Sequence, residues 1–325
     1  MHKIKLIYNI LKLTGILWFF NRLMAQKEQR VVLCYHRISE MKFDHQISFL
    51  KEKFDIVPLN SLLTATFNSH KSPQPQSTKP LLSLTMDDCY GKDFHQSFTV
   101  CQKHQVHCTY FVPTKYAEHQ VSLWSLRLID ILKKLDLPCS ITDFEGIEIT
   151  FNEEQNKKAF ELKWISKFLN NKQQTSEIEA LFDEFFTVNN FKDQADAVIG
   201  NEIIVLNSDN KFTSFQSHTV SHPKLYLCSP TKLKHEFEDS KIYLSKLALN
   251  ENQYVICYPY GSFVHIGDSF KEASNFYEYG VTLQSGLVNR YSDRMLVPRI
   301  GIYEHDTYQS ICVKVVFAQL QAILK

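Results

Sequence analysis

The fold of this chain is decided by residues 81–88, LLSLTMDD, an apolar run that ends in two adjacent carboxylates, Asp87 and Asp88. A second apolar run at 107–112 follows after a helix-length segment, and this spacing predicts parallel strands. The carboxyl ends of such strands face the active site in α/β proteins. An aspartate pair here is also common in turns and helix caps. Our interpretation is a site in which a metal bound to one carboxylate leaves the other ionised as a base.

Strand and helix signals continue on both sides of this stretch. The apolar run at 31–35 predicts a first strand, and the Pro- and Ser-rich segment 68–80 predicts an exposed loop. Apolar residues at helical spacing predict an inserted helical subdomain between about 119 and 208. Ser229 precedes an expected helix, and the elements that follow are a helix at 230–249 and strands at 254–258, 279–283 and 296–303. This alternation indicates an α/β barrel or a doubly wound sheet, and periodicity alone does not choose between them.

Composition identifies an ordinary globular protein. The chain has 325 residues, 44% hydrophobic and 13% aromatic, with a formal net charge of +1. This near-neutral balance gives no electrostatic case for a nucleic-acid partner. The eight cysteines include no CxxC pair, and several lie in apolar runs. Scattered buried thiols favour a reducing compartment, so we expect the protein in the cytoplasm.

The N-terminal segment 1–23 combines apolar and aromatic residues with interspersed lysines and an arginine. Its longest uncharged run, 13–21, is far shorter than the roughly 20 residues that span a bilayer. Lys12 interrupts the apolar stretch that a signal peptide needs. A basic, aromatic helix that lies on a membrane surface fits better, and it would make the protein peripheral on the inner face of the cytoplasmic membrane. The alternative is a helix that packs against the domain.

A histidine pair provides the second chemical motif. Residues 217–223 read SHTVSHP, and we expect His218 and His222 to lie on a helical turn, where both imidazoles can bind one cation. With 13 histidines in the chain, a chance pair is an open alternative. One aspartate and two histidines leave coordination positions open, as in catalytic metal sites. This donor set suits Zn, although Co, Ni or Fe could occupy it.

Two further motifs follow expected strands. Residues 257–261, CYPYG, contain a Pro/Gly turn that by itself indicates only the end of a strand. Residues 34–37, CYHR, place His36 at the end of the first strand, where a lone histidine is usually structural.

Together and in this order, these four motifs resemble the polysaccharide deacetylase family, the metal-dependent carbohydrate esterases that include chitin, peptidoglycan and poly-N-acetylglucosamine deacetylases. The resemblance covers about 30–120 and 208–305. It implies a distorted (β/α) barrel with an inserted helical subdomain. It also implies that Asp87 is the catalytic base and that the Tyr260 backbone N–H helps to bind the oxyanion. The metal ligands it implies are Asp88, His218 and His222.

The expected organisation combines the resemblance with the segment boundaries. It comprises an N-terminal amphipathic helix (1–29), a first part of the barrel (30–118), the helical insertion (119–208) and a second part of the barrel (209–325).

The chain departs from the family pattern at three places. Cys89 stands where a glycine is usual, which puts the local turn in doubt. Cys257 stands where many members have an arginine that orients the base. We expect Arg299 to replace that arginine, the alternative being an exposed charge at a strand end. A C-terminal Leu-x-His motif, which supplies the general acid in many relatives, is missing, and His36 is our candidate substitute, as in relatives resembling poly-N-acetylglucosamine deacetylases.

The expected function is metal-dependent removal of N-acetyl groups from an amino sugar of a surface glycan, or of its lipid- or nucleotide-linked precursor. One alternative is a deformylase or another deacylase on a lipid-linked amino sugar. A second is a glycan-binding relative without catalysis. The sequence identifies neither the sugar, the acyl group, the metal nor the oligomeric state.

Overall fold

The computed structural model describes residues 2–16, 22, 24, 28–68, 79–248 and 252–324. Most of the loop expected at 68–80 lies outside the described residues. So does a large part of the N-terminal segment after residue 16.

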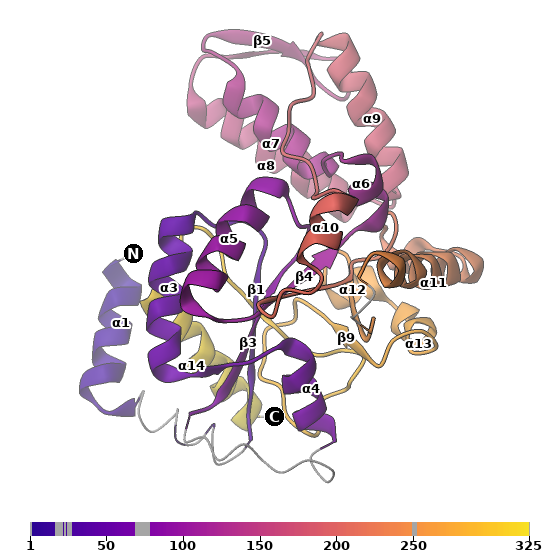
Figure 1. Cartoon of the computed structure of the whole chain (residues 1–325). Coiled ribbons are helices and arrows are strands. Elements are labelled where there is room, and N and C mark those ends of the chain that lie inside the picture. Colours follow the sequence, from indigo (N-terminus) through magenta and orange to yellow (C-terminus); the bar gives the residue numbers. More distant parts are fainter. Residues whose placement is uncertain are drawn as a thin grey trace.

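A parallel sheet forms the centre of the described molecule (Figure 1). Seven of its eight strands follow the order β10-β1-β3-β4-β7-β8-β9, and the eighth, β2, pairs with β3 beside this path. The sheet is curled, as in a distorted (β/α) barrel, which decides between the two architectures left open by periodicity. The strands are β1 (Val31–Tyr35), β2 (Asp55–Ile56), β3 (Leu81–Met86), β4 (Cys108–Val112), β7 (Thr213–Ser217), β8 (Val255–Cys257), β9 (Tyr279–Val281) and β10 (Ile300–Gly301).

The segment 297–302 joins the two edges of this sheet. At its start, the Val297 N–H donates to the Gly280 carbonyl of β9 over 2.8 Å. At its end, the Ile302 N–H donates to the Cys34 carbonyl of β1, also over 2.8 Å. We expected a continuous strand over 296–303, but only Ile300–Gly301 is one, because the segment crosses from β9 to β1 within a few residues.

Side chains alternate along the strands between the barrel interior and the surrounding helices. In β3, Leu82, Leu84 and Met86 belong to the apolar core that includes Phe94 of α5. The intervening positions point the other way and lead to Asp87. The helices around the sheet are α3 (Glu40–Lys53), α4 (Leu59–Phe67), α5 (Gly91–His104), α6 (Thr114–His119), α10 (Asn201–Asn207), α11 (Pro230–Leu247), α12 (Phe263–Ile266), α13 (Ser269–Ala273) and α14 (Tyr308–Leu324).

The helical insertion stands beyond the barrel and has its own aromatic core (Figure 1). It contains α7 (Trp124–Lys134), α8 (Glu154–Asn170) and α9 (Thr175–Val188). Trp124, Trp164 and Phe182 are almost fully buried in its core. An antiparallel hairpin of β5 (Cys139–Thr142) and β6 (Glu148–Phe151) lies between α7 and α8. Its four-residue strands carry too few apolar residues to be recognised from periodicity. The domain boundaries given above remain predictions.

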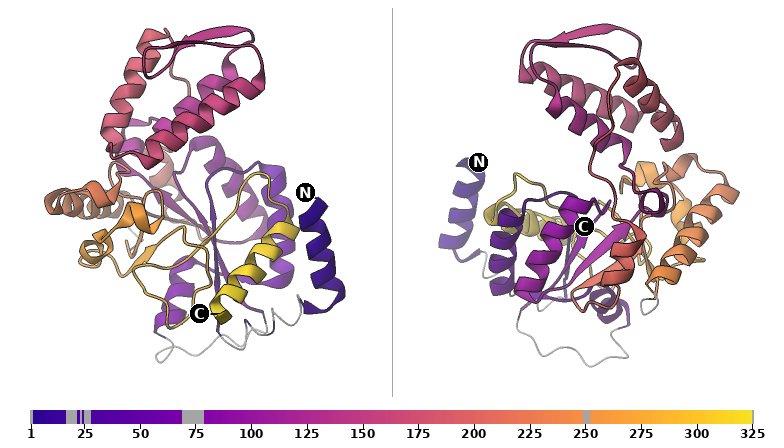
Figure 2. Two further views of the ribbon diagram at one scale, coloured as in Figure 1. Left: turned by 180° about the vertical axis from the view of Figure 1, so that it is seen from behind. Right: turned by 45° about the horizontal axis from the view of Figure 1, so that its top comes forward.

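The N-terminal helix α1 (His2–Leu13) lies beside α14 on the outside of the barrel (Figure 2). Tyr8 is buried there, and its ring packs edge-on against Tyr308 at 5.9 Å between centroids. Other apolar side chains of α1, including Ile10 and Leu13, are exposed. None of the helices in the described ranges is long and apolar enough to cross a membrane.

Candidate active site

The candidate residues meet at the carboxyl ends of the strands. A cavity of about 200 Å³ opens there, and its lining includes residues after β1, β3, β7 and β8 and residues of the helical insertion. Six of the seven candidates line it: His36, Asp87, Asp88, His218, His222 and Tyr260. A larger cavity of about 420 Å³ lies at the opposite ends of the strands, and none of the candidate residues lines it.

Asp88 and the two histidines form a group that could hold a metal ion. The Asp88 Oδ1 atom lies 3.5 Å from His218 Nε2 and 3.6 Å from His222 Nε2. These separations are long for hydrogen bonds. Ligand atoms that bind one tetrahedral ion at 2.0–2.2 Å lie about 3.4 Å apart, so the spacing suits a shared cation.

The chemistry of the three side chains fits the same interpretation. The Asp88 Oδ1 atom is buried and has no hydrogen-bond partner among the described residues. Burial of such an atom is energetically unfavourable unless a cation binds there. His218 Nδ1 lies 2.8 Å from the Cys257 carbonyl, which fixes the proton on that nitrogen and leaves Nε2 free to bind a metal. Burial and the nearby His218 lower the pKa of His222 to about 3, so its ring is neutral.

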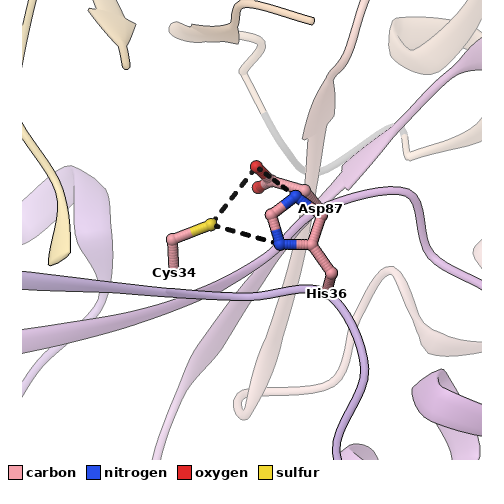
Figure 3. Close-up of side chains that lie close together, drawn as sticks. All are labelled: Cys34, His36 and Asp87. Carbon is pink, nitrogen blue, oxygen red and sulfur yellow. Dashed lines mark hydrogen bonds and ion pairs between the residues drawn. The ribbon is translucent and has the colours of Figure 1, made fainter. Parts of the chain in front are cut away.

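Two other groups with ligand-type atoms adjoin this one. They are Cys34, His36 and Asp87, shown in Figure 3, and Asp87, His218 and Cys257. Both depend on Asp87, whose two oxygens already accept hydrogen bonds from Arg299. Burial also raises the pKa of the Cys34 and Cys257 thiols well above the ordinary value, so both stay protonated. The group around Asp88 is therefore the best metal-binding candidate in the described chain.

The loop that carries the histidines is not a helical turn, contrary to our expectation. His218 directly follows β7, and the chain then passes through a bend with positive φ at Thr219 (68°) and His222 (49°). Left-handed backbone is strained for residues other than glycine. The two rings converge, with centroids 4.8 Å apart, because the bend turns the chain back on itself.

Asp87 is held by a buried arginine that the sequence identified only as a substitute. Arg299 is fully buried and binds Asp87 with two hydrogen bonds of 2.7 Å each. The alternative of an exposed charge at a strand end is therefore wrong. Burial alone would raise the pKa of Asp87, but the Arg299 charge outweighs it and holds that pKa well below its usual range. Asp87 is thus a carboxylate over the whole physiological pH range.

The segment that joins the barrel edges also fixes the arginine. Arg299 Nε donates to the Thr282 carbonyl and Nη1 to Thr85 Oγ1, both over 2.9 Å. Nη2 lies 3.1 Å from the Cys257 sulfur, so the guanidinium occupies space next to the residue that stands in the usual arginine position. Cys34 and Cys257 also lie 3.3 and 3.4 Å from Asp87 Oδ2. The sequence did not predict these thiol contacts, because no local motif indicates them.

His36 faces the same cavity. Its Nε2 atom lies 3.8 Å from Asp87 Oδ2, and its side chain is 37% exposed. The ring is therefore accessible to a ligand in the cavity and close to the carboxylate. This geometry suits a residue that exchanges a proton with a bound substrate.

Tyr260 lies in a strained turn after β8. Its φ is 61°, and its backbone N–H has no hydrogen-bond acceptor among the described residues. The hydroxyl group is held by Thr175 at 3.1 Å and Trp124 at 3.4 Å, both from the insertion. These two bonds fix the side chain, and the backbone N–H remains available to donate a hydrogen bond to a ligand.

The unusual Cys89 does not remove the turn that a glycine normally forms. Asp88 and Cys89 both adopt left-handed backbone, with φ values of 66° and 53°. The Cys89 side chain is fully buried in the main core. The strained turn is therefore kept, with apolar packing that glycine could not provide.

The family model for polysaccharide deacetylases matches residues 185–280 of the chain. This range contains both histidines and the Pro/Gly turn with Tyr260, in the order and spacing that brings them together in the cavity. The resemblance to polysaccharide deacetylases seen in the sequence is therefore confirmed over this segment. The match supports a carbohydrate deacetylase, a hydrolase that acts on amide bonds. The aspartate pair and Arg299 lie outside the matched range.

Solved structures resemble this chain along most of its length. The Streptococcus pyogenes deacetylase PplD in complex with acetate has a TM-score of 0.53 and 18% identity, covering 88% of this chain and 98% of its own. The putative polysaccharide deacetylase BA0330 from Bacillus anthracis gives 0.54 at 15%, covering 88% and 69%. IcaB from Ammonifex degensii gives 0.53 at 16%, covering 88% and 96%. These likenesses bear on the fold. No curated protein sequence matches the chain.

Proposed function

We propose that this protein is a deacetylase that uses a divalent metal to remove N-acetyl groups from an amino sugar in a glycan or a glycan precursor. The observation that supports it most is the buried, unpartnered Asp88 Oδ1 beside two imidazole nitrogens at the edge of the cavity. Zn suits this donor set, and Co, Ni or Fe are compatible with it.

Each side chain in the cavity has a role in amide hydrolysis that matches its surroundings. Asp88, His218 and His222 would hold a divalent ion, which would supply a Lewis acid for the acyl carbonyl. Asp87, kept ionised by its buried arginine, accepts the proton of the attacking water. The Tyr260 N–H donates to the oxyanion that develops on the carbonyl oxygen.

His36 then protonates the departing amine. The proposed acid lies 3.8 Å from Asp87 Oδ2, and its side chain is partly exposed, unlike the buried Asp87. An acid that contacts the leaving group must reach the substrate side of the cavity, and His36 does so.

Apolar side chains limit what fits beside the scissile amide. Leu123, Trp124, Ile165 and Leu169 of the insertion line the cavity together with Leu283. This lining suits the methyl group of an acetyl substituent and the apolar face of a sugar ring. We propose a single amino sugar of a lipid- or nucleotide-linked precursor as the substrate, since the cavity is small and residues of the insertion line it.

The proposal is tested by metal analysis and acetate release. We expect purified protein to bind one equivalent of Zn or Co and to release acetate from N-acetylated amino sugars. Asp88→Ala or His222→Ala should weaken metal binding at least about 100-fold, because each removes a direct ligand. His235→Ala, at an exposed position of α11, should change neither property.

The outcomes separate the competing functions. Release of formate from N-formylated sugars, without release of acetate from N-acetylated sugars, would show that the protein is a deformylase and not a deacetylase. Stoichiometric metal is compatible with both deacetylation and deformylation. Protein that binds sugars but holds no metal and releases no acid would refute the enzymatic proposal in favour of a binding module.

We also propose that α1 holds the protein on the inner face of the cytoplasmic membrane. The described part of the helix carries no acidic residue, and Lys5 and Lys12 are exposed beside an apolar face. Leu6 is 61% and Leu13 86% exposed, although each is large and apolar. A basic helix with an exposed apolar face binds anionic lipid surfaces.

Vesicle cosedimentation tests this attachment. Ile10→Ser with Leu13→Ser should weaken binding to vesicles with anionic lipid at least about tenfold, because each apolar side chain that enters lipid contributes on the order of 1.5–3 kcal/mol when fully buried. Asn9→Ser, at an exposed position of the same helix, serves as the control. Failure of the unmodified protein to bind vesicles at low salt would contradict the attachment.

A further inference from the structure

The loop that carries the metal-binding histidines continues into a lysine with unusual surroundings. Lys224, two residues after His222, is fully buried. Its ammonium group donates to the Phe168 carbonyl, to the Asn171 carbonyl at 2.8 Å and to Asn171 Oδ1 at 2.9 Å. Three acceptors thus satisfy its three N–H groups, as a buried lysine requires.

These acceptors lie at the carboxyl end of α8, in the insertion. The last carbonyls of a helix lack intrahelical partners and carry partial negative charge, so a cation there is stabilising. A charge from the barrel loop therefore caps a helix of the insertion. The same end of α8 carries Ile165 and Leu169, which line the cavity. The position of this end of α8 therefore determines both the wall of the cavity and the position of the loop that carries Lys224.

A second contact reaches the histidine itself. Thr175, the first residue of α9, is 2% exposed and donates its hydroxyl to the His222 carbonyl over 2.6 Å. Its hydroxyl also lies 3.1 Å from Tyr260 Oη. One side chain of the insertion thereby contacts a proposed metal ligand and the residue whose N–H is proposed to bind the oxyanion.

The left-handed backbone of His222 explains why such support matters. A non-glycine residue at φ 49° is strained and persists only where its surroundings hold it. On the barrel side, Glu236 accepts the Val220 and Ser221 N–H groups at 2.9 and 2.8 Å. Those bonds hold the middle of the loop. In the described structure, the side-chain hydrogen bond to the His222 carbonyl comes from the insertion alone.

We infer that the helical insertion positions the metal site, with Thr175 and Lys224 as positioning residues that hold His222 in its strained, metal-binding conformation. The insertion is then part of the catalytic framework as well as a wall over the substrate. This inference rests on the proposed metal site.

Metal affinity, measured by competition with a chromophoric chelator for Co²⁺, tests the inference without an activity assay. Thr175→Val keeps the shape of the side chain and removes its hydroxyl, so we expect Co²⁺ affinity to fall about 10- to 100-fold, as for other groups that orient metal ligands. Thr175→Ser should restore most of it. Thr187→Val, an exposed threonine on the same helix, is the matched control and should bind Co²⁺ like the wild type.

A second variant keeps the test decisive if Thr175→Val does not fold. Thr175→Ala removes the same hydroxyl without a branched side chain, and it should show the same loss. Wild-type Co²⁺ affinity in a folded Thr175 variant that lacks the hydroxyl would overturn the positioning role and leave the proposed function intact. Absence of Co²⁺ binding by the wild type would overturn both.

Discussion

Asp87→Asn is expected to reduce acetate release roughly 10²- to 10⁴-fold, the range lost when a general base is removed. The amide cannot accept the water proton. Metal binding should persist, because Asp88, His218 and His222 supply the proposed ligands and Asp87 is occupied by Arg299. The measurement is kcat on an acetylated amino sugar, with metal content determined on the same folded protein.

A matched control separates loss of the base from loss of a buried carboxylate. Asp93 is 5% exposed and lies 3.4 Å from an arginine, Arg37, but it does not line the catalytic cavity. Asp93→Asn should therefore keep most of the turnover. If folded Asp87→Asn turned over like the wild type, the water proton would have to pass to another group, and the assignment of the base would be wrong.

Several strands were predictable from sequence because apolar runs and their spacing are local. The runs at 31–35 and 81–86 are strands at the predicted residues, and Ser229 caps the predicted helix by accepting the Lys232 N–H. Periodicity could not choose the barrel over a doubly wound sheet; the family resemblance implied the barrel, and segment 297–302 pairs with both edges of the sheet. That pairing depends on residues far apart in sequence.

The candidate site shows the same division between local and long-range information. The aspartates and histidines could be named from short motifs, and the structure brings them to one cavity. The residues that hold this site in place could not be predicted from sequence, because the contacts of Thr175 and Lys224 cross the boundary between the insertion and the barrel. The loop after β7 was interpreted as a helical turn because i, i+4 spacing is typical of one, whereas positive φ at two positions achieves the same convergence.

Arg299→Met is expected to have the largest effect on stability. The arginine and Asp87 are 0% and 2% exposed at their side chains, so neither charge can be solvated by water when its partner is lost. Breaking such a buried pair typically lowers the free energy of unfolding by about 3–5 kcal/mol. Denaturant unfolding measures the change. Arg290→Met, at an exposed position, should stay within about 0.5 kcal/mol of the wild type.

The double variant Asp87→Asn with Arg299→Met distinguishes loss of the pair from loss of packing. When both charges are removed, neither remains buried and unpaired, so the double variant should be less destabilised than the sum of the two single changes. The deficit measures the coupling between the proposed base and its arginine. Additive losses would mean that Arg299 stabilises the barrel through Thr85 and the Thr282 carbonyl, independently of Asp87. A strongly coupled pair would instead explain how the chain tolerates Cys257 in the usual arginine position. Segment 297–302 supplies Arg299, whose charge then replaces that of the usual arginine beside Asp87.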